Sequence, residues 1–387
     1  MGIELSRLIK KMAHMDLMLV AGKGGLSNLV TWVHMAENIE ASDFLDGGQL
    51  AITTGIGLNS RDDILRLLTA FYEKRVSGAI FNIGPFIEEI PEEAIAFCNE
   101  HDFPLFTVPW KAHLAEIMHI CCFALTKEEQ RMMETSAAFR NAIFYPKQEE
   151  LYVIPLTHRS FRVKWKYSVT VMKLDTHAKK PEERLEALRW MLEKQIRSRD
   201  RHFAIFLNEL ELILVFADIS EEDLMMETNE IRGSINRMLE EGESMAMGVG
   251  RLTKSIRCIY KSYNQAKAIQ RLQARGRIGE DRIMYSNLGI YRLLMGIEDH
   301  EIIEEYYNHT LKKLIDYDAA NSSDLCSTLR SYLMNDGSVR DTADELFVHR
   351  NTINYKIKKI EELLGIEMSS LRARTELMIA FNLRDIM

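Results

Sequence analysis

The sequence of 387 residues contains few of the residues that mark non-globular chains. It has only seven prolines and twenty glycines, which excludes collagen-like and Pro/Gly-rich low-complexity classes. No apolar run approaches the roughly 18 residues that a membrane-spanning helix needs, and a typical strong run covers only residues 212–217. The N-terminus lacks the apolar core of a signal peptide, so we expect a cytoplasmic protein. A chain of this length predicts two or three domains.

Cysteine is scarce as well, and its spacing indicates reduced thiols. The five cysteines are widely spread and form no CxxC pair. The densest metal-like cluster runs from His113 through His119 to Cys121 and Cys122. Its two histidines lie about 600° apart around a helix, so they would face different sides, and we expect no metal site. The glycine-rich stretch 21–25 lacks the Lys-Ser/Thr pair of a P-loop, and no cofactor is expected.

Positive charge is in deficit over the whole chain. Lys and Arg number 49 and Asp and Glu 57, which gives a formal net charge of −8. This balance argues against non-specific binding to nucleic acid or to an acidic membrane. The total does not say where the positive charges lie.

Residues 1–125 alternate short apolar segments with helical periodicity. The pattern predicts an α/β domain with a largely parallel sheet. We expect strands at 17–21, 31–35, 50–54, 79–83 and 105–108, and helices at 61–74 and 91–101.

A glycine-containing loop leads into the third predicted strand of this region, and this loop and the end of the strand are the candidate ligand site. Strand ends are the usual ligand crevice of such sheets. The alternative is a pair of turns that bind nothing. The residues are Gly47, Gly48, Thr53, Thr54 and Gly55.

The middle of the chain has a different order of elements. Residues 127–144 are polar with helical character and predict a connecting helix. Residues 150–275 follow the order β-α-β-β-α-β-α, which suits an antiparallel sheet with helices on one face, the α+β class. We expect strands at 167–174, 203–207, 210–216 and 245–249, and helices at 181–197, 221–240 and 253–273.

From residue 287 onward the sequence is nearly all helical and ends in a helix-turn-helix pattern. Amphipathic helices are expected at 299–316 and 325–334. A capping box at Ser338 opens the next helix, which ends near Leu346, and residues 347–349 form a turn. A second helix spans 350–364 and stops at Gly365. A last helix, 370–383, with Ser369 as the expected N-cap, braces the motif through Leu377, Ala380 and Leu383.

The helix at 350–364 has the chemistry of a DNA recognition helix. Its apolar residues make one inward stripe, Ile353, Ile357, Ile360 and Leu364. The remaining positions up to residue 359 carry basic, amide or hydroxyl groups and no acid. Such groups bind base edges and phosphates. The alternative is an ordinary solvated helix face.

Residues 346–365 strongly resemble the C-terminal helix-turn-helix of PucR/CdaR-type bacterial transcriptional regulators. The family pattern is close to L-x-V-H-R-N-T-x-x-Y-R-x-x-x-I-E-x-L-L-G, and this chain departs from it with Lys356 in place of arginine. Lysine keeps the positive charge but cannot form the paired hydrogen bonds of an arginine guanidinium group. Residues 1–125 resemble the PucR-type N-terminal domain. Residues 150–275 resemble the family's degenerate GGDEF-like domain.

The hairpin at 207–212 lacks the glycine pair of an active diguanylate cyclase, and Asp175 is the only acid near the end of the first strand. The resemblance therefore does not extend to nucleotide cyclisation. The implied multidomain organisation is a ligand-sensing α/β domain at 1–125, a connecting helix at 126–149, a GGDEF-like α+β domain at 150–280 and an all-α region at 281–387. Within the last region the DNA-binding core is 324–387.

The resemblance implies a ligand-responsive regulator of a catabolic or nitrogen-metabolism operon, more often an activator, working as a homodimer on double-stranded DNA. We assign contacts with base edges to Arg350, Asn351 and Asn354. We assign contacts with DNA phosphates to His349, Thr352, Tyr355, Lys356, Lys358 and Lys359. Two other hypotheses stay open: a nucleotide-binding or nucleotide-processing enzyme built on the middle domain, and a scaffold whose C-terminal helices bind a protein.

Overall fold

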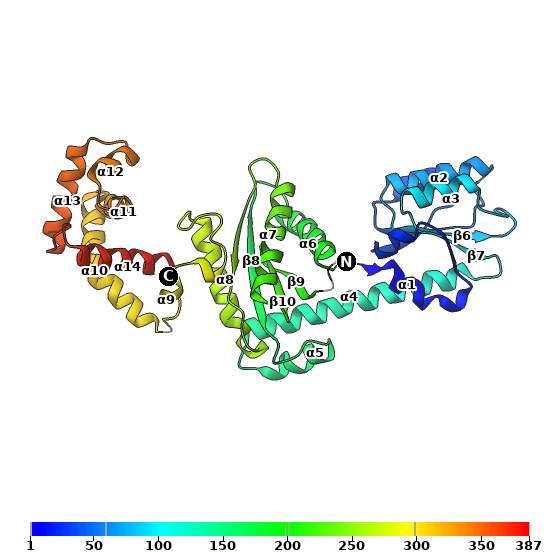
Figure 1. Cartoon of the computed structure of the whole chain (residues 1–387), viewed down its shortest axis with the longest axis horizontal. Coiled ribbons are helices and arrows are strands. Elements are labelled where there is room, and N and C mark those ends of the chain that lie inside the picture. The colour runs from blue at the N-terminus through cyan, green and yellow to red at the C-terminus, as the bar shows by residue number, and fades with distance from the viewer. Residues whose placement is uncertain (1, 59, 198, 200, 298, 387) are drawn as a thin grey trace. The chain divides into compact units, whose positions relative to one another are not determined.

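The structure is a computed structural model that describes residues 2–58, 60–197, 199, 201–297 and 299–386. The chain forms two compact units (Figure 1). The first comprises Met1–Val163 and Glu186–Phe206, and the second comprises Lys164–Leu185 and Leu207–Met387.

The N-terminal part of the first unit is the expected α/β domain. Its five-stranded sheet has the order β2-β7-β6-β5-β4, parallel from β4 to β7 and antiparallel between β2 and β7. All five predicted strands are present. They are β2 (Met18–Ala21), β4 (Trp32–Met35), β5 (Gln49–Thr53), β6 (Gly78–Ile83) and β7 (Leu105–Pro109).

Both faces of this sheet are covered. Alternate residues of β5 point to opposite sides, so Leu50 and Ile52 join one core cluster and Ala51 joins the other. Helices α2 (Arg61–Glu73) and α3 (Glu92–Glu100) supply the cluster on the Ala51 side. Helix α1 (Leu5–Lys11) and the start of α4 (Leu114–Phe144) supply the other. Two short strands that the pattern did not predict, β1 (Ile3–Glu4) and β3 (Leu29–Val30), pair beside them.

The connecting helix is longer than predicted. Helix α4 has 31 residues, about 46 Å by the rise of an α-helix, and its first half includes the histidine–cysteine cluster. That half buries Ile117 and Cys121 against the sheet, while the second half buries Phe139 and Ile143. The short helix α5 (Val153–His158) follows it.

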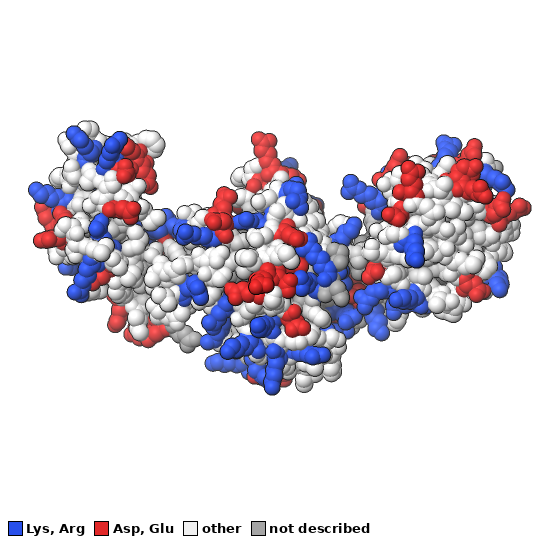
Figure 2. Space-filling view, viewed as in Figure 1, with Lys and Arg blue, Asp and Glu red and all other residues white. Residues whose placement is uncertain are grey.

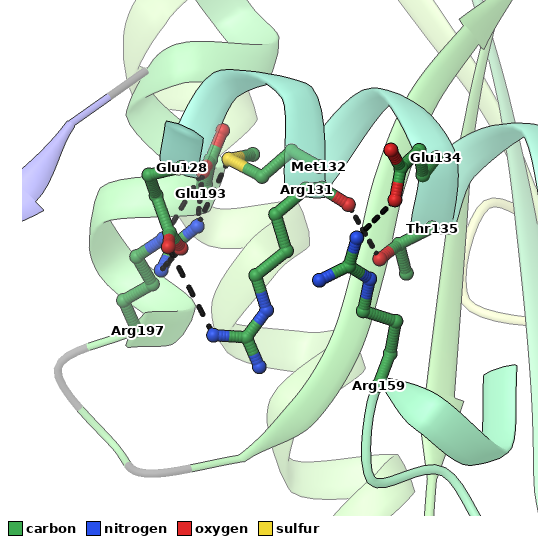
Figure 3. A network of polar contacts seen from close by, with 8 residues as sticks. All are labelled: Glu128, Arg131, Met132, Glu134, Thr135, Arg159, Glu193 and Arg197. Carbon is green, nitrogen blue, oxygen red and sulfur yellow. Dashed lines mark hydrogen bonds and ion pairs between the residues drawn. The ribbon is translucent and has the colours of Figure 1, made fainter. Parts of the chain in front are cut away.

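A polar network ties the second half of α4 to two neighbouring segments (Figure 3). The Arg197 guanidinium lies 2.9 Å from Glu193 and 3.8 Å from Glu128. Arg159, just after α5, pairs with Glu134. Within this unit the network joins the helix that leaves the N-terminal sheet to the end of α6 (Pro181–Arg197).

The middle sheet has the order β11-β8-β10-β9. Its strands are β8 (Tyr167–Asp175), β9 (His202–Asn208), β10 (Glu211–Ala217) and β11 (Ser244–Val249). Their order with α6, α7 (Glu221–Met238) and α8 (Ile259–Ala274) confirms the α+β prediction. Helix α8 begins six residues later than predicted, after a 3₁₀ turn that Ser255 caps.

The expectation of helices on one face of this sheet was wrong. Strand β10 is buried along its whole length, and Figure 1 shows α7 and α8 on opposite sides of β8. Gly248 of β11 lies so close to α8 that an added Cβ would stand 2.1 Å from the Ala266 carbonyl oxygen. The missing side chain thus lets α8 pack directly on the sheet.

The C-terminal region is all helical, as predicted. It contains α9 (Tyr291–Leu294), α10 (His300–Asn321), α11 (Leu325–Met334), α12 (Val339–Glu345), α13 (Arg350–Leu364) and α14 (Leu371–Ile386). Leu314, Leu329, Ile353, Ile360 and Ala380 meet in one core. No helix in the described residues is long and apolar enough to cross a membrane.

Candidate nucleic-acid interface

Helices α12 and α13 form the predicted helix-turn-helix. The Ser338 Oγ accepts a hydrogen bond from the Asp341 N–H at 3.3 Å and so caps α12. The chain then turns through Phe347, which has φ of 53° and is 95% exposed. The Val348 N–H donates to the Ala343 carbonyl at 3.0 Å and closes the turn.

His349 is the N-cap of α13, a role that the sequence pattern did not indicate. Its Nδ1 accepts a hydrogen bond from the Asn351 N–H at 3.2 Å. A neutral imidazole that accepts at Nδ1 has its proton on Nε2. Because His349 is exposed, this Nε2–H is available as a donor beside the first turn of the helix.

Helix α13 separates its apolar and polar residues as expected. Ile353, Ile357 and Ile360 are buried, and Gly365 ends the helix with φ of 68°. Six of the predicted DNA-binding residues on the helix are exposed: Arg350, Asn351, Thr352, Asn354, Tyr355 and Lys358. The structure therefore brings these six and His349 together over the N-terminal half of α13.

The other two predicted residues are placed differently. The Lys356 Nζ lies 2.5 Å from the Asp324 carboxylate and 3.3 Å from the Thr328 Oγ1, and its side chain is only 17% exposed. Lys359 lies 3.4 Å from Glu362 and over the ring of Tyr317. Asp324 is 32 positions before Lys356, so local sequence could not reveal the pair.

The two remaining cations of α13 differ from Lys356 and Lys359. Among the described residues, Arg350 and Lys358 have no carboxylate within ion-pair distance. Figure 2 shows acidic and basic side chains interspersed over the C-terminal helices. The exposed half of α13 therefore carries two cations that are free to meet an anion.

Helix α14 braces the motif through Leu377, Ala380 and Leu383, which are all buried as predicted. Its N-terminus differs from the prediction by one residue. The Ser370 Oγ, and not that of Ser369, accepts a hydrogen bond from a backbone N–H, that of Ala373, at 3.3 Å.

The candidate ligand residues of the N-terminal domain fall at opposite ends of β5. Gly47 and Gly48 precede the strand with φ of 91° and 78°, in a turn where the Gly48 N–H donates to the Arg75 carbonyl. Thr53 is the last residue of the strand, and Thr54 and Gly55 follow it. They are therefore two separate places on the sheet.

The side chain of Glu37, from the same domain, occupies the carboxyl end of β5. The Glu37 carboxylate accepts from the Thr53 Oγ1 at 3.1 Å, the Thr54 N–H at 2.9 Å and the Gly55 N–H at 3.2 Å. The carboxyl end of β5 thus binds a carboxylate in this structure, and that carboxylate is internal.

Two acidic residues of the middle domain bear on the comparison with nucleotide cyclases. Glu211, at the hairpin, is buried and pairs with Lys267. Asp175 is exposed at the end of β8. Among the described residues, no group of three or more His, Cys, Asp or Glu side chains could hold a metal ion.

The histidine–cysteine cluster has structural roles. The His119 ring stacks on Phe123, and the buried Cys121 thiol lies 3.7 Å from the Met12 sulfur. Burial raises the pKa of Cys121 to about 12, so this thiol stays protonated and is a poor metal ligand.

Three families of known proteins match this chain. Residues 8–125 match the purine catabolism regulatory protein-like family, and residues 158–272 match the GGDEF-like domain. Residues 325–383, which include α11 to α13 and most of α14, match the PucR C-terminal helix-turn-helix domain.

Three individual relatives come from Bacillus subtilis. The proline-responsive transcriptional activator PutR is 29% identical over 202 residues, which is 50% of this chain and 49% of that protein. The DNA-binding transcriptional activator AdeR is 27% identical over 147 residues, 37% and 34% of the two chains. The purine catabolism regulatory protein is 33% identical over 93 residues, 24% and 17%. The similarity thus spans about half the length of the first relative and less of the other two.

Proposed function

We propose that this chain, which belongs with the PucR-type regulators by its three matched domains, is a DNA-binding transcriptional regulator. The observation that carries the proposal is the exposed N-terminal half of α13. There two uncompensated cations, two asparagines and two hydroxyl groups stand on a helix that three buried isoleucines anchor. These are the groups that read base edges and hold phosphates in the major groove.

The proposed contacts follow from the geometry of the helix. Arg350, Asn351 and Asn354 read bases, because they project from the first turns of the recognition helix. His349, Thr352, Tyr355 and Lys358 hold phosphates, with the His349 Nε2–H as its donor. Lys356 and Lys359 reach a phosphate only by leaving their acidic partners, so we expect them to contribute less to affinity.

The working unit that we propose is a homodimer. Two copies of α13 would enter half-sites about 34 Å apart, one turn of DNA, or a multiple of it. The domain boundaries that fit this role are 1–125 for sensing, 126–149 for connection, 150–280 for the GGDEF-like domain and 281–387 for DNA binding. Because a bacterial chromosome lies in the cytoplasm, this role implies a cytoplasmic protein.

The regulated genes and the signal are also proposals. The names of the relatives support activation of a catabolic operon for an amino acid or a purine, in response to a small molecule. Such a metabolite would act through the N-terminal domain. The Glu37 contacts favour the carboxyl end of β5, at Thr53, Thr54 and Gly55, over the turn at Gly47 and Gly48.

We propose that the chain has no enzymatic activity of its own. The Glu211–Lys267 pair at the hairpin and the exposed Asp175 support a structural middle domain. Incubation with GTP and Mg²⁺ tests this directly, and a product whose formation depends on Asp175 would overturn it.

Recovery of bound DNA tests the regulatory function. The full chain is mixed with sheared genomic DNA and the retained fragments are sequenced. We expect a few discrete sites that disappear with Arg350→Ala and persist with Arg372→Ala, an exposed arginine outside α13. Absence of discrete sites with the unaltered chain would support the scaffold hypothesis instead.

A further inference from the structure

A cavity of about 580 Å³ lies in the second unit, where the segment after α8 meets the C-terminal helices. Four arginines line it, two from the α8 end and one each from α11 and α14. They are Arg275, Arg277, Arg330 and Arg384. A cavity of this volume is in the range of small-molecule sites.

The aspartates that line the same cavity already have partners. Asp385 is buried and accepts from both terminal nitrogens of Arg330, at 2.9 Å and 2.5 Å, and from the Tyr291 hydroxyl at 3.1 Å. Arg277 adds a contact at 3.5 Å. Asp318 accepts the N–H groups of Leu325 and Cys326 at the start of α11.

Two of the four arginines have no carboxylate partner among the described residues. Arg275 donates only to the backbone carbonyl of Asp385, at 3.4 Å. Arg384 lies 3.8 Å from the Cys326 sulfur and over the Tyr307 ring. Ser323 and Ser327 line the cavity as well, and their hydroxyls donate to the Asp318 carboxylate at 2.5 Å and to the Asp324 carbonyl at 2.9 Å. Among the described residues, the cavity thus offers two guanidinium groups without a carboxylate partner.

We propose that this cavity binds a small dianionic metabolite, a phosphate monoester or a dicarboxylate. Two unpaired guanidinium groups match its two negative charges, and guanidinium forms paired hydrogen bonds with either type of oxygen. The site is separate from the N-terminal domain and from the exposed face of α13. The site is concave and Phe381 is one of its lining residues, which favours a small molecule over the convex backbone of DNA.

One residue that lines the cavity also contacts the recognition helix. Asp324, which also lines the cavity, forms the ion pair with Lys356 of α13. Arg277 and Tyr291 belong to the segment after α8, and both bind Asp385 of α14. A bound dianion therefore touches the residues that join the middle domain to the DNA-binding helices. This consequence rests on the proposed function, and by linkage the dianion and DNA would change each other's affinity equally.

Titration calorimetry without DNA tests the site independently of DNA binding. The full chain, in a buffer free of phosphate, is titrated with inorganic phosphate, adenosine 5′-monophosphate and succinate. We expect saturable binding of at least one probe. Removal of both guanidinium groups in R275Q/R384Q should weaken it about tenfold or more. Both arginines are exposed, so the variant keeps its fold, which far-UV circular dichroism checks.

The matched control is R372Q, which removes an exposed arginine at the other end of α14. This variant should bind the probes as tightly as the unaltered chain does. Preference for the monophosphate over succinate assigns a phosphate ester, and the reverse assigns a dicarboxylate. The proposal is overturned if no probe binds saturably, or if R275Q/R384Q binds as tightly as the unaltered chain. It is also overturned if R275Q/R384Q weakens DNA binding in the absence of any probe, because the arginines are then phosphate contacts of the DNA.

Discussion

Lys356 of α13 forms an ion pair with Asp324, the residue just before α11, with 2.5 Å between its Nζ and the carboxylate. The pair holds the lysine at the flank of α13 and removes one of four clustered positive charges from the DNA-binding face. Lys358, two positions later, is exposed and without an acidic partner among the described residues. Two lysines of one helix turn thus have different expected roles.

These roles predict different salt dependences of DNA binding. DNA affinity falls as salt concentration rises, and each phosphate neutralised by a cation makes the slope of log K against log salt concentration steeper by about 0.9. Lys358→Gln should therefore make the slope shallower by about 0.9, and Lys356→Gln should leave the slope nearly unchanged. The slopes come from anisotropy titrations of labelled promoter DNA at several salt concentrations. Equal losses in the two variants would show that Lys356 leaves Asp324 on binding.

Substitutions on the two faces of α13 should separate stability from DNA affinity. Ile360 is fully buried, so Ile360→Ala should destabilise the helix by about 2–5 kcal/mol. Tyr355 is 71% exposed, and Tyr355→Ala should weaken DNA binding with little change in stability. Hydrogen exchange of the α13 amides measures the first effect. Equal protection in the Ile360→Ala variant and the unaltered chain would contradict the burial.

The buried Asp385 should matter more for stability than the exposed Asp324. Asp385→Asn leaves Arg330, which is 19% exposed, without its charged partner, and we expect a loss of about 3 kcal/mol. Asp324→Asn removes a partner whose side chain is 62% exposed, so less than about 1 kcal/mol is expected. Urea denaturation compares the two variants. The reverse order would contradict the network around Asp385.

A pH dependence is expected from the pair of Arg184 and Glu243. The hydrogen bonds from Arg184, followed by those from the Glu240 N–H and the Thr176 hydroxyl, lower the pKa of Glu243 to about 2 from its ordinary 4.5. A lowered carboxyl pKa stabilises the folded state above pH 4.5, and this stability is lost as pH falls toward 2. The loss is at most about 3 kcal/mol.

Glu243→Gln should remove this part of the acid sensitivity. Urea denaturation between pH 5 and 2 should show a shallower loss of stability in the variant than in the unaltered chain. Glu240→Gln is the control, because that side chain is 74% exposed and 3.7 Å from Arg184. An unaltered pH profile in Glu243→Gln would rule out the stated role of the pair.

Sequence periodicity was sufficient for elements whose pattern is local. The five strands of the main N-terminal sheet were predicted because short apolar runs end at turn residues. Helix α13 was predicted because its apolar stripe, the capping box of the preceding helix and Gly365 all lie within one short stretch. The clustered basic residues on its polar face likewise gave the candidate DNA-binding site.

Features that depend on contacts distant in sequence were not predicted. The first half of α4 has a buried face that becomes recognisable only against the sheet it covers. The partner of Lys356 lies 32 positions earlier, just before α11. The two ends of β5, about 16 Å apart by strand geometry, appeared as one ligand site in the sequence. The arginines of the cavity come from three separate segments, so no local pattern marks them.

The central claim is that the exposed half of α13 reads DNA sequence, and Arg350 tests it most directly. Anisotropy titrations would compare the unaltered chain and Arg350→Ala on a promoter fragment recovered with the chain, each against a scrambled fragment at the same salt concentration. We expect Arg350→Ala to lose about 1–3 kcal/mol of affinity for the promoter and almost none for the scrambled DNA. Undiminished preference for the promoter in Arg350→Ala would contradict the account.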